Sequence, residues 1–137
     1  MFLLCCILLY ISNSCNLQTC WDLWWNGNPD EHCAPYRLIR GTDLCPDDKK
    51  NKVELAKARK VMEHLIALLR SVSVPIARIA RDSIQERRRY FGEALIALYK
   101  DLYPGKTLED FDRLRFGHLS YLRVYDLLVE AKRNGSI

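Results

Sequence analysis

The sequence contains no apolar run long enough to cross a lipid bilayer. A membrane-spanning helix needs about 20 consecutive apolar residues, whereas the apolar run at the amino terminus covers only residues 1–11. Glycine and proline are scarce, with 6 and 5 residues among 137, and no segment repeats at a fixed period. Collagen-like, disordered and repeat architectures are therefore excluded, and we expect one ordinary folded domain with no membrane partner.

The sequence also lacks the signatures of an enzyme. His32, His64 and His118 stand far apart, and none adjoins a recognisable nucleophile. There is no glycine-rich phosphate loop and no Gly-x-Ser-x-Gly turn that would expose a nucleophilic serine. We therefore expect a non-catalytic protein without a cofactor.

The cysteines allow two interpretations of the first third of the chain. Residues 1–14 have the length and apolar character of a signal peptide, or represent a start codon predicted too far upstream. Cleavage there would leave four cysteines, enough for two disulfides in a secreted helical interaction or effector protein. The alternative is an intracellular chain with free thiols. Three of them, Cys20, Cys33 and Cys45, could offer metal ligands together with His32, but they lack the paired spacing of zinc sites, so we expect no metal. The four are Cys15, Cys20, Cys33 and Cys45.

Positive charge is concentrated in one part of the chain. Residues 49–90 hold twelve Lys or Arg against four Asp or Glu, a local excess of +8, so the remainder must sum to −4 for the total of +4. Such a block favours a polyanionic partner, either nucleic acid or an anionic membrane surface. The alternative is an ordinary solvated helix face.

The apolar periodicity predicts an all-α single domain of four to five helices, with an irregular connector after the first short helix. That first helix is predicted to begin at Thr19, whose hydroxyl would cap it, and to end at Gly27. All three tryptophans of the chain fall within it at spacings of three and four residues, so they share one side and are predicted to anchor the core. They are Trp21, Trp24 and Trp25.

A long basic helix is predicted after the connector. Residues 28–48 carry turn-forming residues, interrupted by residues 36–40, which we interpret as a docking segment in preference to a short strand. A continuous helix is then predicted from Asp48 to Arg70. Its predicted apolar stripe is Val53, Ala56, Val61, Leu65, Leu68 and Leu69.

The second half of the chain is predicted to contain two further long helices. One is expected to start at Ser73 and to run without a break to Leu102. The other is expected to start at Thr107 and to continue to a stop at residues 134–135. We divide the chain into the apolar segment 1–14, a Trp-cluster and basic-helix unit 15–72, and a helical extension 73–137.

Three segments together carry a family resemblance. Leu23-Trp24-Trp25-x-Gly27, then residues 34–38 (Ala-Pro-Tyr-Arg-Leu), then the basic stretch 55–62 resemble the DNA-binding domain of fungal transcription activators of glycolytic genes. Relatives of that domain occur in oomycete and Crypton-transposon-derived proteins. The resemblance covers residues 19 to 70 and implies a nuclear DNA-binding module, transcription-regulatory or transposon-derived. It does not extend to the helical extension, for which we expect a role in homo-oligomerisation.

The resemblance also implies roles for individual basic residues. Arg37, Arg40 and Arg59 would read bases, because a guanidinium pairs bidentately with guanine. The lysines would neutralise phosphates and position the protein. The implied nucleic-acid contacts are Arg37, Arg40, Lys49, Lys50, Lys52, Lys57, Arg59 and Lys60.

Overall fold

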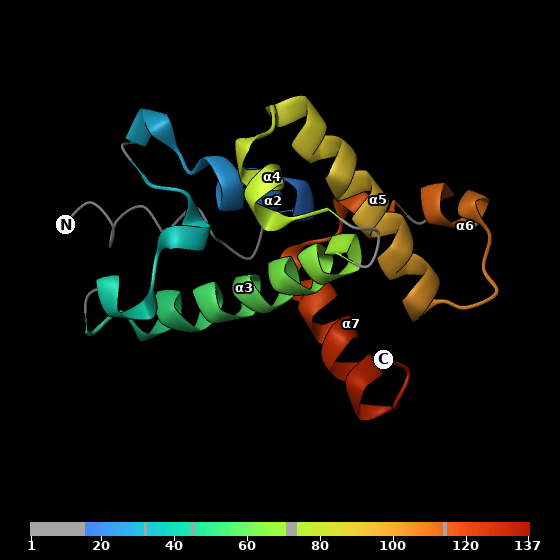
Figure 1. The fold of residues 1–137 in the computed structure, drawn as a ribbon. Helices are drawn as coiled ribbons and strands as arrows, with labels where there is room; N and C mark the ends of the chain where they lie inside the picture. Colours follow the sequence, from blue (N-terminus) through green and yellow to red (C-terminus); the bar gives the residue numbers. More distant parts are fainter. Residues whose placement is uncertain (1–15, 32, 45, 71–73, 114) are drawn as a thin grey trace.

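The computed structural model describes residues 16–31, 33–44, 46–70, 74–113 and 115–137, and it is built from helices (Figure 1). Within these residues there are six α-helices, four of them seven residues or longer, and no strand. The predicted all-α fold, with short irregular turns after the first described helix, is therefore confirmed. The apolar segment 1–14, together with Cys15, His32, Cys45 and Ser73, lies outside the described residues.

Helix α2 (Leu17–Asn26) has its cap three residues earlier than the sequence pattern predicts. The side chain of Asn16, not that of Thr19, caps it by accepting a hydrogen bond from Thr19 N at 2.8 Å. Asparagine is as good a cap as threonine, and its position adds one further turn to the helix. Gly27 ends the helix with φ of +65°, and a Cβ there would lie 2.3 Å from the carbonyl oxygen of Cys33. Only glycine fits both constraints.

The three tryptophans of α2 are buried and hold the helix against the rest of the fold. Trp21 is fully buried, and its indole N–H donates to the carbonyl oxygen of Arg87 at 3.0 Å. Its ring centroid lies 5.5 Å from those of Trp25 and Phe91. Trp24 and Trp25 are 3% and 5% exposed. The cluster is thus part of the core and not an exposed binding surface.

The connector consists of three 3-10 turns that pack onto the protein. They are η2 (Pro29–Glu31), η3 (Tyr36–Leu38) and η4 (Gly41–Asp43). Tyr36 and Ile39 are buried, and η3 packs against α2. The docking interpretation of this segment therefore agrees with the structure, and the strand alternative does not.

Helix α3 (Lys49–Arg70) lies along the centre of the fold and packs against helices α5 (Ile84–Leu102) and α7 (Tyr121–Arg133) (Figure 1). Its bounds agree with the prediction to within a residue, but part of the predicted apolar stripe is wrong. Val53 is 52% exposed and Ala56 is also exposed. The buried side is rotated away from them because α5 and α7 both cover the opposite side. It consists of Asn51, Glu54, Leu55, Ala58, Val61, Met62, Leu65, Ile66 and Leu69.

The continuous helix expected from Ser73 to Leu102 is wrong, because it is divided into α4 (Ile76–Arg81) and α5. Between them Asp82 is extended, and its carboxylate accepts a hydrogen bond from the Tyr90 hydroxyl at 2.8 Å. Ser83 then caps α5 by accepting from Glu86 N at 3.2 Å. The bond of Ser83 satisfies the start of α5, and the bond from Tyr90 fixes Asp82 between the two helices. Together they outweigh the apolar periodicity that runs through the break.

The last predicted helix is also divided. Thr107 caps α6 (Leu108–Arg113) as expected, accepting from Asp110 N at 3.4 Å. The chain then passes through η5 (Phe116–His118), because Arg115 adopts a left-handed conformation with φ of +50°. Ser120 starts α7 by accepting from the backbone N–H three residues ahead at 3.1 Å. The expectation of one continuous helix from Thr107 is therefore wrong.

Residues 15–72 and 73–137 share one hydrophobic core where the structure describes them. Helix α3 of the first segment packs against α5 and α7 of the second. The backbone N–H of Leu17 also donates to the carbonyl oxygen of Leu119 at 2.9 Å, which joins the start of α2 to the start of α7. The boundary at residue 72 therefore separates two stretches of sequence, not two folding units.

Candidate nucleic-acid interface

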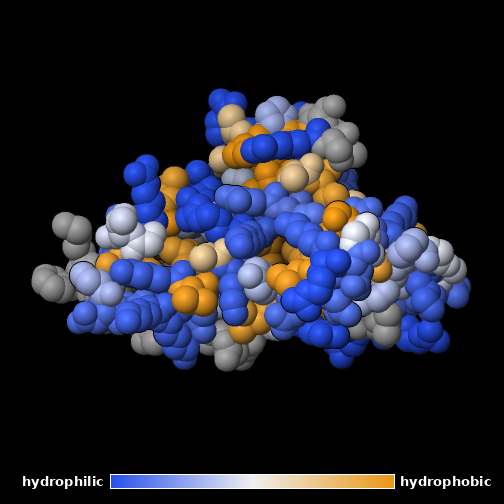
Figure 2. All heavy atoms as spheres, turned by 90° about the horizontal axis from the view of Figure 1, so that it is seen from below, coloured by the Kyte–Doolittle hydropathy of each residue, from blue (hydrophilic) through white to orange (hydrophobic). Residues whose placement is uncertain are grey.

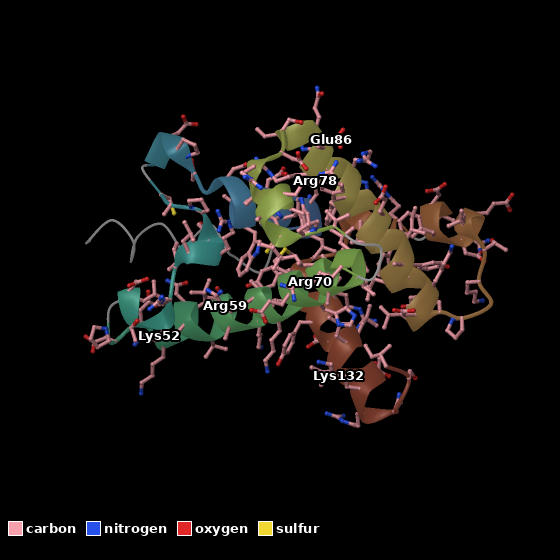
Figure 3. The ribbon with its side chains drawn as sticks, in the orientation of Figure 1. Lys52, Arg59, Arg70, Arg78, Glu86 and Lys132 are labelled. Carbon is pink, nitrogen blue, oxygen red and sulfur yellow. The ribbon has the colours of Figure 1, made fainter. Side chains whose placement is uncertain are left out.

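Four cations lie on one side of α3. A helix turns by about 100° per residue, so Lys49, Lys52, Lys60 and Arg70 fall within an arc of about 80°. Lys52, Arg59 and Arg70 follow one another along the helix, whereas Lys132 belongs to α7 (Figure 3). We call the exposed side that carries Lys49, Lys52, Lys60 and Arg70 the cationic face of α3. Glu63 is the only acidic residue of α3 on this arc, since Glu54 is buried on the opposite side.

The cationic face is not neutralised by ion pairs within the described part of the chain. The ion pairs that the structure shows there are made by Arg78, Arg88, Arg89 and Arg113, all outside α3. Lys52 does contact the backbone, with its Nζ donating to the carbonyl oxygen of Pro46 at 3.4 Å. Its positive charge is still uncompensated. This face is therefore the strongest candidate for an interaction with a polyanion.

Arg59 is committed to holding the connector against α3. Its Nη2 donates to the carbonyl oxygen of Ile39 at 2.5 Å, and its Nη1 donates to that of Arg37 at 3.4 Å. Its guanidinium also lies over the ring of Trp24, 5.0 Å from the centroid. A side chain used in this way has few donors left for a base edge, so we interpret Arg59 as a structural residue.

The other two arginines expected to read bases differ from each other. Arg37 is half-buried, and its guanidinium carbon lies 5.6 Å from the ring centroid of Trp25. Arg40 is exposed, and its backbone N–H, not its side chain, donates to Asp43 at 2.8 Å. Of the three, Arg40 alone has a side chain fully available at the surface.

The remaining lysines of the predicted set lie off the cationic face. Lys50 and Lys57 are rotated about the helix axis from Lys49 by about 100° and 80°, both in the direction away from Lys52 and Arg70. Lys57 places its Nζ 5.3 Å from the ring centroid of Tyr125 on α7. The structure therefore brings together only part of the predicted set, and it adds Arg70, which the sequence-based selection missed although its helical spacing from Lys52 was visible.

The arginine triplet at the start of α5 is used inside the protein. Arg87 donates to the carbonyl oxygen of Asp82 at 2.5 Å and to the side chain of Asn26. Arg88 pairs with Asp22 of α2 at 3.1 Å. Arg89 pairs with two acids of its own helix at 2.8 and 3.0 Å. Arg88 and Arg89 are thus paired with acidic side chains and Arg87 is held by neutral acceptors, so the triplet is less available to a polyanion than the cations of α3.

Two neighbouring cavities open along the flank of α3, and both are lined by Glu63. The first, of about 300 Å³, is lined by Gly41, Lys52, Leu55, Ala56, Arg59, Lys60 and Glu63. The second, of about 350 Å³, is lined by Trp24, Arg37, Glu63, Ile66, Arg70 and Ile76. The cationic face is therefore hollowed. Gly41 of the connector lines the first cavity, so its sequence neighbour Arg40 lies at the edge of this face.

Burial perturbs several titratable groups, among them His64 and Cys33. Burial lowers the pKa of His64, and nearby Lys132 lowers it further while Asp101 acts in the opposite direction. Burial also raises the pKa of the Cys33 thiol, more than its hydrogen bonds lower it. His64 is therefore neutral near pH 7 and adds no charge to the surface.

The described residues show neither a metal site nor a membrane span. No three His, Cys, Asp or Glu side chains among them are grouped as a metal ion would require. None of the helices in this part of the chain is both long enough and apolar enough to cross a bilayer. The face seen in Figure 2 is mainly hydrophilic, with separate apolar spots.

Comparisons with known proteins give no match: no family model, no curated protein and no solved structure resembles this chain closely enough to be significant.

Proposed function

We propose that the protein is a non-catalytic DNA-binding module that contacts duplex DNA through the cationic face of α3. The single observation that carries this proposal is the row of cations on that face, which make no ion pair within the described residues. A cation that is already paired gains little from a phosphate, because it must give up its partner. An unpaired one releases a counterion from DNA when it binds.

The dimensions of α3 support this proposal. Its 22 residues span about 33 Å, which is close to one helical turn of the DNA duplex, about 34 Å. Cations spaced along such a helix can reach phosphates on both sides of a groove. The core contacts of α3 with α5 and α7 hold the helix in place, so the cations are presented without further ordering of the backbone.

Most of the expected contacts are to the DNA backbone. Lys49, Lys52, Lys60 and Arg70 would contact phosphates, which fix position but carry no sequence information. Arg40 is the remaining candidate for a base contact, since Arg59 and Arg37 are engaged by the Trp cluster. We therefore expect modest sequence preference.

The biological role and location of the module are a further part of this proposal. The resemblance of residues 19–70 to DNA-binding domains of transcription activators supports a regulatory or transposon-derived role in the nucleus. Homo-oligomerisation through the helical extension is a separate part of the proposal. The secreted alternative with two disulfides is less well supported, because Cys33 is a buried free thiol.

The test is binding of the full chain to a mixed-sequence DNA duplex at about 50 mM salt, measured by fluorescence anisotropy. The test variant carries Lys49→Gln, Lys52→Gln and Lys60→Gln. Its matched control carries the same three changes at exposed lysines elsewhere: Lys100→Gln, Lys106→Gln and Lys132→Gln. The proposal expects weakened binding in the first variant only. Absence of binding by the unmodified chain at this salt concentration would refute it.

A further inference from the structure

The second cavity on the flank of α3 has the size and walls of a ligand site. It lies where α2, η3, α3 and α4 meet, and its volume is about 350 Å³. Sites for small organic molecules are typically about 300–1,000 Å³ and combine apolar walls with a few polar groups. This cavity combines Trp24, Ile66 and Ile76 with three charged side chains.

Two of the charged side chains are arginines with unused hydrogen-bond donors. The Nε atom of Arg37 is buried, and it has no hydrogen-bond partner among the described residues. A buried donor of a charged group is costly to leave unpaired. Arg70, in the last turn of α3, lines the same cavity and makes no ion pair within that part of the chain. Two guanidinium groups at one cavity are typical of sites for phosphate or carboxylate groups.

The third charged side chain, Glu63, limits the ligand to one that also offers a donor. No ion pair joins Glu63 to Arg37 or Arg70 in the described structure, so its carboxylate is available to a ligand. A bare inorganic anion would be repelled by this carboxylate and would leave the apolar walls without a contact. A carboxylate does accept well from the exocyclic amine of a nucleobase, such as the N4 amine of cytosine.

We propose that this cavity binds a nucleoside monophosphate whose base carries an amino group. Arg37 and Arg70 bind the phosphate, the apolar walls of Trp24, Ile66 and Ile76 contact the base, and Glu63 accepts a hydrogen bond from the amine. This site can be tested separately from the DNA-binding proposal, because Arg70 is the one member of the cationic face that lines it and the three lysines of that face do not.

The test is isothermal titration of the full chain with CMP, UMP, cytidine and inorganic phosphate at constant ionic strength. CMP and UMP differ at the position where one has the amine and the other a carbonyl, so CMP should bind at least about fivefold more tightly. Cytidine and inorganic phosphate should each bind more weakly than CMP. Equal affinity for CMP and UMP, or for CMP and inorganic phosphate, would overturn the proposal.

Variants locate the binding. Arg70→Gln should weaken CMP binding by at least about tenfold, as expected for loss of a hydrogen bond to a charged group. Its matched control is Arg133→Gln, an exposed arginine in the last turn of α7, which should bind CMP normally. Ile76→Trp should abolish binding by filling the cavity, with circular dichroism confirming that it is folded.

The outcome is separable from that of the DNA experiment. The variant with glutamine at positions 49, 52 and 60 should bind CMP like the unmodified chain. Unchanged CMP affinity in both Arg70→Gln and Ile76→Trp would show that the nucleotide binds elsewhere and would overturn the proposal.

Discussion

Replacing Arg59 with alanine should destabilise the protein by about 3 kcal/mol. The variant loses the bond from the guanidinium to the carbonyl oxygen of Ile39, and such a bond from a charged group contributes roughly 1.5–3 kcal/mol. It also loses the contact with the ring of Trp24, which adds about 0.5–1 kcal/mol. For 137 residues the entropy of unfolding is about 290 cal/mol/K, so the Tm should fall by about 10 °C.

The assay is urea unfolding of Arg59→Ala followed by circular dichroism and tryptophan fluorescence. Lys60→Ala is the matched control, because it is the exposed neighbour on the same helix and has a similar gain in helix propensity. It should change stability by no more than about 0.5 kcal/mol. If the two variants were equally stable, Arg59 would not hold the connector, and its assignment as a structural residue would be wrong.

Three other substitutions or modifications test the fold. Gly27→Ala should lower the free energy of unfolding, measured in urea, by more than about 3 kcal/mol, because its Cβ clashes with the backbone in addition to the strain of a positive φ. Gly105→Ala has a positive φ but open space around it, so it should cost only about 1 kcal/mol. Equal costs would contradict the close approach of Gly27 to the backbone of Cys33 and Ala34. Ser83→Ala should lower the free energy of unfolding by about 1 kcal/mol through loss of the α5 cap, whereas an unchanged value would argue for an unbroken helix. Burial raises the pKa of the Cys33 thiol, so its contribution to the free energy of unfolding is fully present below the unfolded pKa and is lost as pH rises through the folded pKa. Iodoacetamide at pH 8 should therefore alkylate Cys33 more slowly in the native chain than in urea, as measured by peptide mass spectrometry. Equal rates would show that Cys33 is not buried.

Features set by a few neighbouring residues could be predicted from the sequence. The bounds of α3, the glycine that ends α2 and the Thr107 cap all follow from local capping and turn signals. The burial of the tryptophans follows from helical spacing, because residues three and four apart share a side.

The breaks within the second half could not be read as easily. The Ser83-x-x-Glu86 signal was present, but apolar residues recur across it at helical spacing. The tertiary bonds that Tyr90 and Arg87 make to Asp82 show why the chain is interrupted there. The left-handed Arg115 has no sequence signal, since few residues other than glycine adopt that conformation.

The candidate site was predicted only in part, for a related reason. A lysine on an exposed arc of a helix can be recognised by its spacing alone. Whether an arginine is free or engaged depends on tertiary contacts, as the bond between Arg59 and a carbonyl twenty residues away shows. Arg37 and Arg59 therefore looked like base-reading residues in the sequence and proved to be packed against Trp25 and Trp24.

The salt dependence of DNA binding tests the central proposal most directly. If Lys49, Lys52, Lys60 and Arg70 each neutralise one phosphate, the logarithm of the binding constant should fall against the logarithm of salt concentration with a slope of about −3.6. The variant with glutamine at positions 49, 52 and 60 should reduce the slope to about −0.9, and the matched variant at positions 100, 106 and 132 should leave it unchanged. Equal slopes for the two triple variants would contradict the assignment of DNA binding to the cationic face of α3.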